Sequence, residues 1–187
     1  AYYRRGSAAS RMSVNDVDLD YIKQARLFHL TGITPALSET CRQTSIKALE
    51  IASEHNLTIS FDTNIRLKLW NKDEAKKTLL PMLKKADIVL IEPEDAEILI
   101  GESEPEKIVE AIVAMGVKNA VIKLGAEGAL ASTENEIVRL PAFKVPVEDV
   151  IGAGDAFAAG FISSIMRGLS IEEALEIGNA AGAMVVT

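Results

Sequence analysis

Short β-rich runs alternate along this chain with longer segments in which apolar residues recur three and four positions apart. Strands that alternate with helices usually lie parallel in one sheet, so the pattern predicts an α/β fold with a mostly parallel sheet covered by helices. The carboxyl ends of the strands should then form the functional site. The predicted strands are 27–30, Thr58–Asp62, Ile88–Ile91 and Asn119–Lys123.

Two crossover helices are predicted over residues 38–55 and 72–86, where charges lie opposite an apolar face. Pro81 lies inside the second of them and supplies no amide hydrogen to the preceding turn, so we expect a helix boundary or a bend near Leu80.

The pattern changes after Lys123. Residues 128–133 and 137–143 read as two antiparallel strands appended to the sheet. Two helices follow, the first ending at Gly168 and the second opening with the capping-box spacing of Ser170 and Glu173. Their many glycines and alanines predict close packing against the sheet.

Composition bounds the class of protein. The 187 residues are enough for one sizeable core, so a single domain over residues 1–187 is expected. A net charge of −7 argues against a general nucleic-acid binder, which needs clustered Lys and Arg. Cys41 is the only cysteine, so an intrachain disulfide is excluded, and no apolar run has the length of a membrane span. These features fit an acidic cytoplasmic protein.

The stretch "DVIGAGDAFAAGF", residues 149–161, carries the most specific chemistry. If a turn at 151–154 leads into a helix, the amides of Gly152, Ala153 and Gly154 point outward at the positive end of the helix dipole and form an anion site. Asp155 would repel that anion unless it takes a proton, so phosphoryl transfer gives both features a use. The alternative is a plain strand-to-helix turn, with glycines for packing and Asp155 as a helix charge.

This stretch resembles the signature of the ribokinase-like (PfkB) sugar kinases, whose pattern is D-T-x-G-A-G-D followed by small residues and Phe. The resemblance covers nearly the whole chain and implies a ribokinase-like fold with helices on both faces of the sheet. It implies ATP and Mg²⁺ as cofactors, an anion hole at Gly152, Ala153 and Gly154, and Asp155 as the catalytic base that contacts the substrate hydroxyl.

The resemblance also implies a nucleotide site. The segment "KLGAEGA" is similar to the family's nucleotide-binding strand and loop, and alone it would be an ordinary turn. Asn179 matches the helix that borders the adenine pocket, although an Asn on a helix is more often a polar surface residue. The implied ATP-binding residues are Asn64, Lys123, Leu124, Gly125, Gly128, Gly152, Gly154 and Asn179.

Two further segments resemble 2-keto-3-deoxygluconate kinases and related fructokinases: "FDTNIRLKLW" and "YYRRGSAAS", the latter as a lid strand over residues 1–10. By this match Tyr2, Arg4, Ile33 and Arg66 contact the substrate. An arginine can grip a carboxylate with two hydrogen bonds, which favours a sugar acid. The alternatives are a solvated surface charge for Arg4 and, for Arg66, an ion pair with Asp62 or with a neighbouring helix.

The sequence departs from the family pattern at two places. Val150 replaces the usual Thr, which removes a hydroxyl but no backbone amide. Glu92 and Asp95 occupy the family's N-x-x-E segment, where they could hold water around Mg²⁺ or simply stabilise a helix dipole, so the metal ligands stay open.

Family members have more chain before "YYR", so we expect that this sequence is part of a longer kinase and is inactive alone. Three functions follow: an ATP-dependent kinase that converts 2-keto-3-deoxygluconate to its 6-phosphate, a kinase of a neutral sugar or nucleoside, or a non-catalytic nucleotide-binding domain. The expected partners are a small sugar acid and ATP, with no nucleic acid and no membrane. A homo-oligomer is compatible with the sequence.

Overall fold

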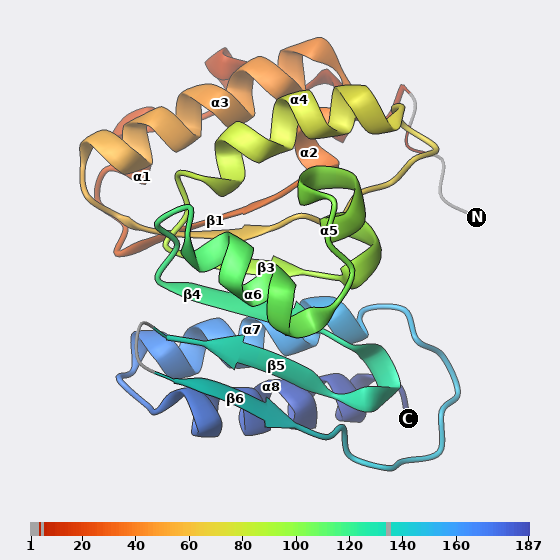
Figure 1. Cartoon of the computed structure of the whole chain (residues 1–187). Coiled ribbons are helices and arrows are strands. Elements are labelled where there is room, and N and C mark those ends of the chain that lie inside the picture. Colours follow the sequence, from red (N-terminus) through yellow and green to blue (C-terminus); the bar gives the residue numbers. More distant parts are fainter. Residues whose placement is uncertain (1–3, 5, 134–135) are drawn as a thin grey trace.

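The computed structural model describes residues 4, 6–133 and 136–187. Its six strands form one sheet in the order β1-β2-β3-β4-β5-β6 (Figure 1). Strands β1 to β4 are parallel, β5 is antiparallel to β4, and β6 is antiparallel to β5. All six predicted strands are present, but β1 is one residue longer than expected, β5 covers only 129–132 of the predicted 128–133, and β6 ends at Leu140 and not at residue 143. The strands are β1 (Leu27–Thr31), β2 (Thr58–Asp62), β3 (Ile88–Ile91), β4 (Asn119–Lys123), β5 (Ala129–Ser132) and β6 (Ile137–Leu140).

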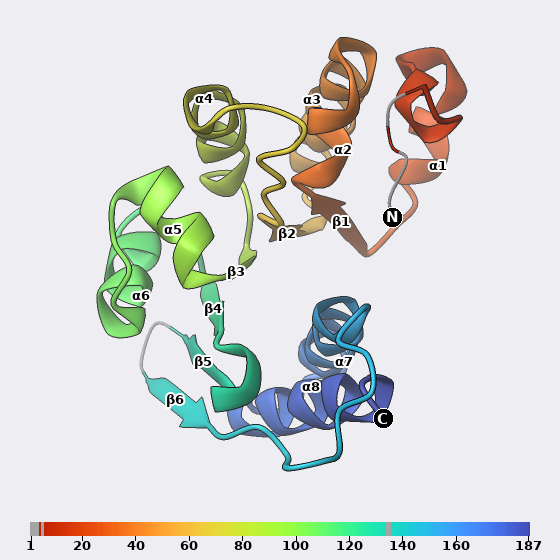
Figure 2. The same cartoon turned by 90° about the vertical axis from the view of Figure 1, so that its right-hand side faces the viewer.

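Helices cover both faces of the sheet, as predicted. Figure 2 shows one group of helices on one side of the curved sheet and the last two helices on the other. The first group is α3 (Glu39–Glu54), α4 (Lys72–Leu83), α5 (Pro93–Ile100) and α6 (Pro105–Val113), and the second is α7 (Ala153–Met166) and α8 (Ile171–Val185). No helix in the described part of the chain is both long and apolar enough to cross a membrane.

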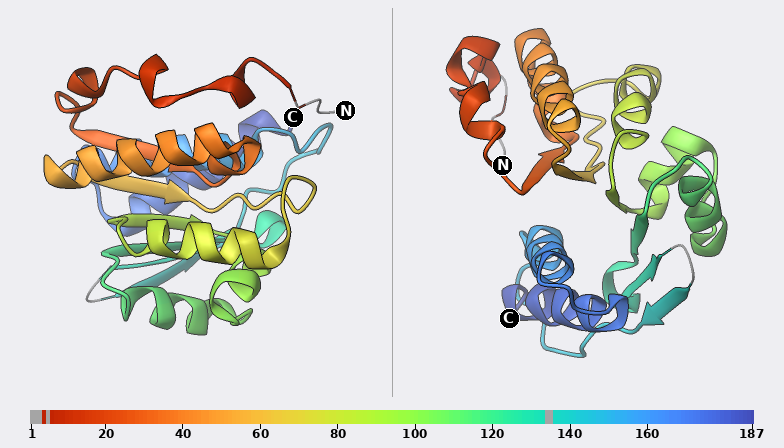
Figure 3. Two further views of the ribbon diagram at one scale, coloured as in Figure 1. Left: turned by 90° about the horizontal axis from the view of Figure 1, so that it is seen from above. Right: turned by 90° about the vertical axis from the view of Figure 1, so that its left-hand side faces the viewer.

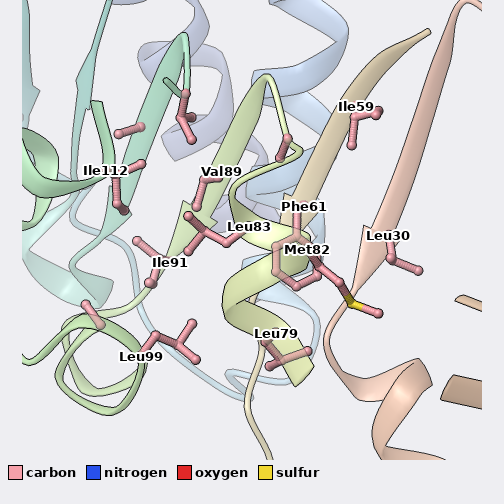
Figure 4. Close-up of a cluster of buried hydrophobic side chains, with 14 of the residues drawn as sticks. Leu30, Ile59, Phe61, Leu79, Met82, Leu83, Val89, Ile91, Leu99 and Ile112 are labelled. Atoms are coloured by element: carbon pink, nitrogen blue, oxygen red, sulfur yellow. The ribbon is translucent and has the colours of Figure 1, made fainter. Parts of the chain in front are cut away.

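The sheet separates two hydrophobic cores. Phe61, Val89 and Ile91 belong to the larger core, which they share with α4 and its neighbours (Figure 4). Ile88 and Leu90 belong to the core beneath α7 and α8. Because both faces of β3 are covered, all four of its residues are buried, which is why this strand reads as an unbroken apolar run.

The two crossover helices are confirmed, and no helix boundary lies near Leu80; the alternative of a bend there stays a prediction. The helix α4 continues through Pro81 and ends at Leu83. Pro81 is exposed and lies in the last turn, so its missing amide removes one hydrogen bond close to a natural end. The amide of Lys84 still donates to the carbonyl of Leu80 at 3.2 Å.

The close packing predicted for α7 and α8 is present, and Ala158 and Ala174 belong to the core that these helices share with the sheet. Three of their glycines, Gly160, Gly178 and Gly182, lie against the other helix of the pair. A Cβ on Gly160 would lie 3.0 Å from the carbonyl oxygen of Ile177, and one on Gly178 would lie 3.0 Å from the ring of Phe157. The helix ends are as predicted, with a positive φ of 80° at Gly168 and a capping box between Ser170 and Glu173.

The amino-terminal segment runs alongside α3 (Figure 3) through the short elements η1 (Ala9–Arg11), η2 (Val14–Asp16) and α1 (Leu19–Ile22). The described residues 4 and 6–10 form no strand, so they do not show the predicted lid strand. Ser7 and Ser10 instead close turns with neighbouring backbone groups. Residues 1–3 and 5 lie outside the described residues.

Candidate functional site

The turn before α7 has the geometry that the glycine motif predicts. Gly152 is the N-cap residue with φ 88°, a left-handed conformation that favours glycine, and the helix begins at Ala153. Asp155 lies in the first turn, at the edge of the sheet where the parallel strands end. The end of α8 supports the approach to this turn, because the carbonyl of Val186 accepts hydrogen bonds from the amides of Glu148 at 2.7 Å and Asp149 at 3.4 Å.

Two of the three expected amides are available for an anion. The amide of Ala153 donates to the carbonyl of Val150 at 3.3 Å and so closes the turn, which corrects the expectation of three outward donors. The amides of Gly152 and Gly154 have no hydrogen-bond partner among the residues that the structure describes. The positive end of α7 therefore presents two backbone donors beside the Asp155 carboxylate.

A lysine whose side chain is only 10% exposed lies beneath this turn. The Lys123 ammonium is 3.0 and 2.8 Å from the two carboxylate oxygens of Asp62 and 3.6 Å from an oxygen of Glu92. A Cβ placed on Gly154 would lie 3.9 Å from the Lys123 Nζ atom. The site thus holds a cation next to the two amides, and all three groups could contact one bound anion.

Asp62 is a site residue that the sequence interpretation missed. Among the described residues Asp62 forms its ion pair with Lys123 and none with Arg66, whose guanidinium donates to the carbonyl of Ile65, so the alternative in which Asp62 pairs with Arg66 is wrong. The signal was present, because Asp62 and Lys123 are each the last residue of a predicted parallel strand, and such ends meet at one edge of a sheet. What the sequence did not give is the strand order, with β3 lying between the two.

Asp95 is buried and serves a neighbouring connection. Its carboxylate accepts hydrogen bonds from the Thr63 hydroxyl at 2.7 Å and from the Ile65 amide at 3.0 Å. Burial raises the pKa of Asp95, and the hydrogen bonds from Ile65 and Thr63 partly oppose that rise. Glu92, the N-cap residue of α5, is half exposed and makes no side-chain cap hydrogen bond. The two carboxylates therefore differ: Asp95 fixes the connection after β2, and Glu92 faces the open edge.

The predicted nucleotide loop forms a tight turn between β4 and β5. The amide of Leu124 donates to the carbonyl of Gly128 at 2.9 Å around the short helix η3 (Gly125–Glu127). Gly125 has open space around its Cβ position, whereas a Cβ on Gly128 would overlap the carbonyl oxygen of Leu140. Gly125 can therefore border a ligand, and Gly128 is needed for close backbone packing.

Asn179 is buried rather than on the surface. Its side-chain amide donates to the carbonyl of Pro141 at 3.2 Å and to that of Leu140 at 3.5 Å. It ties α8 to the segment that follows β6. Its predicted place beside the adenine stays a prediction.

The substrate-side residues follow β1 and β2. Ile33 opens the short helix α2 (Ile33–Leu37) directly after β1, and Asn64 has a positive φ of 38° in the connection after β2. Arg66 is exposed, and its guanidinium donates to the carbonyl of Ile65 at 3.1 Å. Arg4 lies half-buried in the amino-terminal segment, and its placement beside Arg66 stays a prediction. Tyr2 lies outside the described residues.

The site fits the phosphates of a nucleotide better than a resident metal ion. Two glycine amides without a hydrogen-bond partner among the described residues lie at the start of α7, and the Lys123 ammonium is 3.9 Å from the Cβ position of Gly154. Within the described ranges, no group of three His, Cys, Asp or Glu side chains is placed to hold a metal. Mg²⁺ often binds through one or two carboxylates together with substrate phosphates and water, so the ion would arrive with the nucleotide. Glu92 is the exposed carboxylate that fits this role.

Comparison with known sequences identifies relatives over the whole chain. The family described as pfkB family carbohydrate kinase matches residues 1–187. The 2-dehydro-3-deoxygluconokinase of Thermoproteus tenax is 40% identical over 99% of this chain and 56% of its own length. The enzyme of the same name from Bacillus subtilis is 38% identical over 99% of this chain and 58% of its own length. The probable fructokinase-6 of Arabidopsis thaliana is 33% identical over 99% of this chain and 50% of its own length. The chain thus spans 50 to 58% of the length of these relatives.

Solved structures show the same architecture. The PfkB protein from Polaromonas sp. JS666 is similar with a TM-score of 0.90 and 37% identity, over 100% of this chain and 62% of that one. A putative ribokinase II from E. coli, in complex with ATP and Mg²⁺, is similar with a TM-score of 0.92 and 29% identity, over 100% of this chain and 60% of that one. These likenesses confirm the predicted fold class.

Proposed function

Because this chain belongs to the pfkB family of carbohydrate kinases, we propose that the protein transfers a phosphoryl group from ATP to a hydroxyl of a sugar acid. The proposed reaction converts 2-keto-3-deoxygluconate to its 6-phosphate. One observation carries the proposal: Asp155 directly follows two available glycine amides, one of them at Gly154, whose Cβ position is 3.9 Å from the Lys123 ammonium, so a proton acceptor and an anion site share one turn.

Each group has a defined task in this reaction. Asp155 accepts the proton of the attacking hydroxyl, which makes the oxygen a better nucleophile. The amides of Gly152 and Gly154 donate to the oxygens of the transferred phosphoryl group, where negative charge is spread in the transition state. Mg²⁺, bound with ATP, neutralises phosphate charge.

The sugar-acid assignment is supported by Arg66 and by the names of two relatives. Arg66 is exposed at the strand edge, and its guanidinium can form two hydrogen bonds with a carboxylate. The two relatives with the highest identity reported above are named 2-dehydro-3-deoxygluconokinases. The fructokinase relative supports the second candidate, a kinase of a neutral sugar. Turnover measured with ketodeoxygluconate, fructose, ribose and adenosine separates the two.

The base assignment is tested by Asp155→Asn in the whole protein. The variant should bind ATP as the native protein does, while turnover falls about 10²- to 10⁴-fold, the range for a lost general base. Unchanged turnover would remove Asp155 from the mechanism. ATP binding by the native protein without transfer to any sugar would favour the non-catalytic alternative.

The acid specificity is tested by Arg66→Met, with Lys68→Met on the same exposed connection as the control. Loss of hydrogen bonds to a carboxylate is worth roughly 1.5 to 3 kcal/mol, so kcat/KM for the sugar acid should fall about 10- to 150-fold. The neutral analogue should lose much less, and Lys68→Met should change neither. Equal losses for the acid and the neutral analogue would mean that Arg66 does not read the carboxylate.

The remaining expectations concern the setting of the enzyme. The proposal includes a cytoplasmic location and a small-molecule substrate, with no role for nucleic acid or membrane. Formation of a homo-oligomer stays a prediction, which sedimentation of the whole protein would test.

A further inference from the structure

The ion pair between Asp62 and Lys123 joins two strands that are not neighbours. Asp62 ends β2 and Lys123 ends β4, so the lysine side chain crosses the end of β3 to reach the carboxylate. Both side chains are buried, with exposed fractions of 3% for Asp62 and 10% for Lys123. A buried charge is costly to leave without a partner, so each group fixes the position of the other.

The hydrogen bonds of the ammonium leave one donor for a ligand. A lysine ammonium has three N–H donors, and two of them account for the contacts of 3.0 and 2.8 Å with the Asp62 oxygens. The Glu92 oxygen, at 3.6 Å, is beyond hydrogen-bond distance. The Cβ position of Gly154 lies 3.9 Å from the nitrogen, so the third donor is next to the turn that begins α7.

Asp62 and Glu92 make unequal contributions to this arrangement. Asp62 holds the ammonium with both of its oxygens from a rigid strand end, whereas Glu92 is 47% exposed and contacts it through one oxygen. If Asp62 lost its charge, Glu92 would be the remaining ion-pair partner, on the open side of the site. The ammonium would then no longer be fixed beneath Gly154.

We propose that Asp62 is a positioning residue for phosphoryl transfer: it holds the Lys123 ammonium beneath the Gly152–Gly154 turn, where the third N–H donates to an oxygen of the transferred phosphoryl group. This inference rests on the proposed function and deepens it. Asp62 acts only through Lys123 and does not contact the substrate. The pair also links the sugar side of the site, which follows β2, to the phosphate side at α7.

The test uses Asp62→Asn, Lys123→Met and the double variant in the whole protein. Each single variant should lower kcat about 10- to 150-fold, the equivalent of a hydrogen bond from a charged group, and should change the KM for the sugar less than about threefold. The double variant should be no worse than Lys123→Met, because Asp62 has no role without the lysine. Lys123→Arg keeps the cation and should retain more activity than Lys123→Met.

The matched control is Lys118→Met. Lys118 pairs with Asp87 at 2.8 Å at the opposite end of the same sheet. This variant should keep kcat within about twofold of the native value. A loss of kcat in Lys118→Met as large as that in Asp62→Asn would overturn the proposal, because removing any ion pair of the sheet would then lower kcat equally. Additive losses in the double variant would also overturn it.

A binding measurement separates this proposal from the proposed function. If the native protein phosphorylates none of the sugars tested, the proposed kinase function is contradicted. Affinities for ATP and adenosine would still test whether the Asp62–Lys123 pair contacts phosphate. Lys123→Met and Asp62→Asn should weaken ATP binding at least about 10-fold while leaving adenosine binding unchanged. Equal weakening of both ligands would overturn the positioning role. If Asp62→Asn does not fold, the comparison of Lys123→Arg with Lys123→Met carries the same test.

Discussion

At the residue scale, Asp95 shows how a carboxylate can be structural within a candidate active site. Its two hydrogen bonds hold Thr63 and Ile65 in the connection that leads to Asn64 and Arg66. Asp95→Ala leaves the amide of Ile65 and the hydroxyl of Thr63 without their acceptor, so the free energy of unfolding should fall by about 1–3 kcal/mol. Asp95→Asn keeps an acceptor oxygen and should cost much less. Denaturant unfolding of both variants measures the difference.

The pKa of Asp95 predicts how that comparison changes with pH. Because burial raises the pKa of the Asp95 carboxyl in the folded state above its ordinary value of 3.8, the native state keeps this proton over a pH range in which the unfolded state has lost it. The contribution of Asp95 to stability is thus present at lower pH and is lost as pH rises through the folded pKa. The Asn side chain of Asp95→Asn does not titrate, so the stability of this variant relative to the native protein should increase as the pH rises above about 4. A stability difference between Asp95→Asn and the native protein that stays constant with pH would contradict the raised pKa of Asp95.

At the element scale, the turn between β4 and β5 depends on two glycines for different reasons. Gly128 has φ 99° and ψ −135°, a conformation reserved for glycine, and a Cβ there would overlap backbone atoms of the segment after β6. Gly125 also has a positive φ, 57°, but no atom lies near its Cβ position. Gly125→Ala should cost about 1–2 kcal/mol, and Gly128→Ala should cost more and lower the melting temperature further. Equal melting temperatures would contradict the close backbone contact.

The pairing of α7 with α8 gives a second element-scale prediction. Gly160→Ala places a methyl group 3.0 Å from the Ile177 carbonyl oxygen, and such overpacking costs about 1–3 kcal/mol. Alanine is the better helix former by about 1 kcal/mol, so a net loss of stability would show that the contact outweighs propensity. Ser163→Ala, on the exposed side of α7, is the control and should be neutral or stabilising. A stabilised Gly160→Ala variant would mean that the helices can separate without cost.

The elements were predictable from the sequence to the extent that local chemistry decides them. The bounds of β2, β3 and β4 follow from buried apolar runs that end in polar residues, and the Ser170 cap follows from its spacing to Glu173. The passage of α4 through Pro81 was not predictable, because it depends on which side of the helix faces solvent. The contact of Gly160 with α8 likewise depends on tertiary packing.

At the scale of the whole molecule, the sheet gathers the ends of separate strands into one site. The sequence supplied the motif at Gly152–Asp155 and the residues after β2. It could not supply the ion pair of Asp62 with Lys123, because 61 positions separate the two residues and only the strand order brings them together. The interpretation of Arg66 as an ion-pair partner of Asp62 failed for that same reason.

The hydrogen bonds from Glu148 and Asp149 to the Val186 carbonyl have a dynamic consequence. The last turn of α8 and the loop before α7 must open together, because the loop loses these bonds when the turn unwinds. Hydrogen–deuterium exchange should therefore show the Glu148 amide exchanging at the rate of the closing turn of α8, and a ligand held at Gly152–Gly154 should slow both. Exchange at Glu148 that stays fast while α8 is protected would contradict this coupling. In this protein the loop that leads to the Gly152–Gly154 turn should therefore open no more often than the adjacent last turn of α8 unwinds.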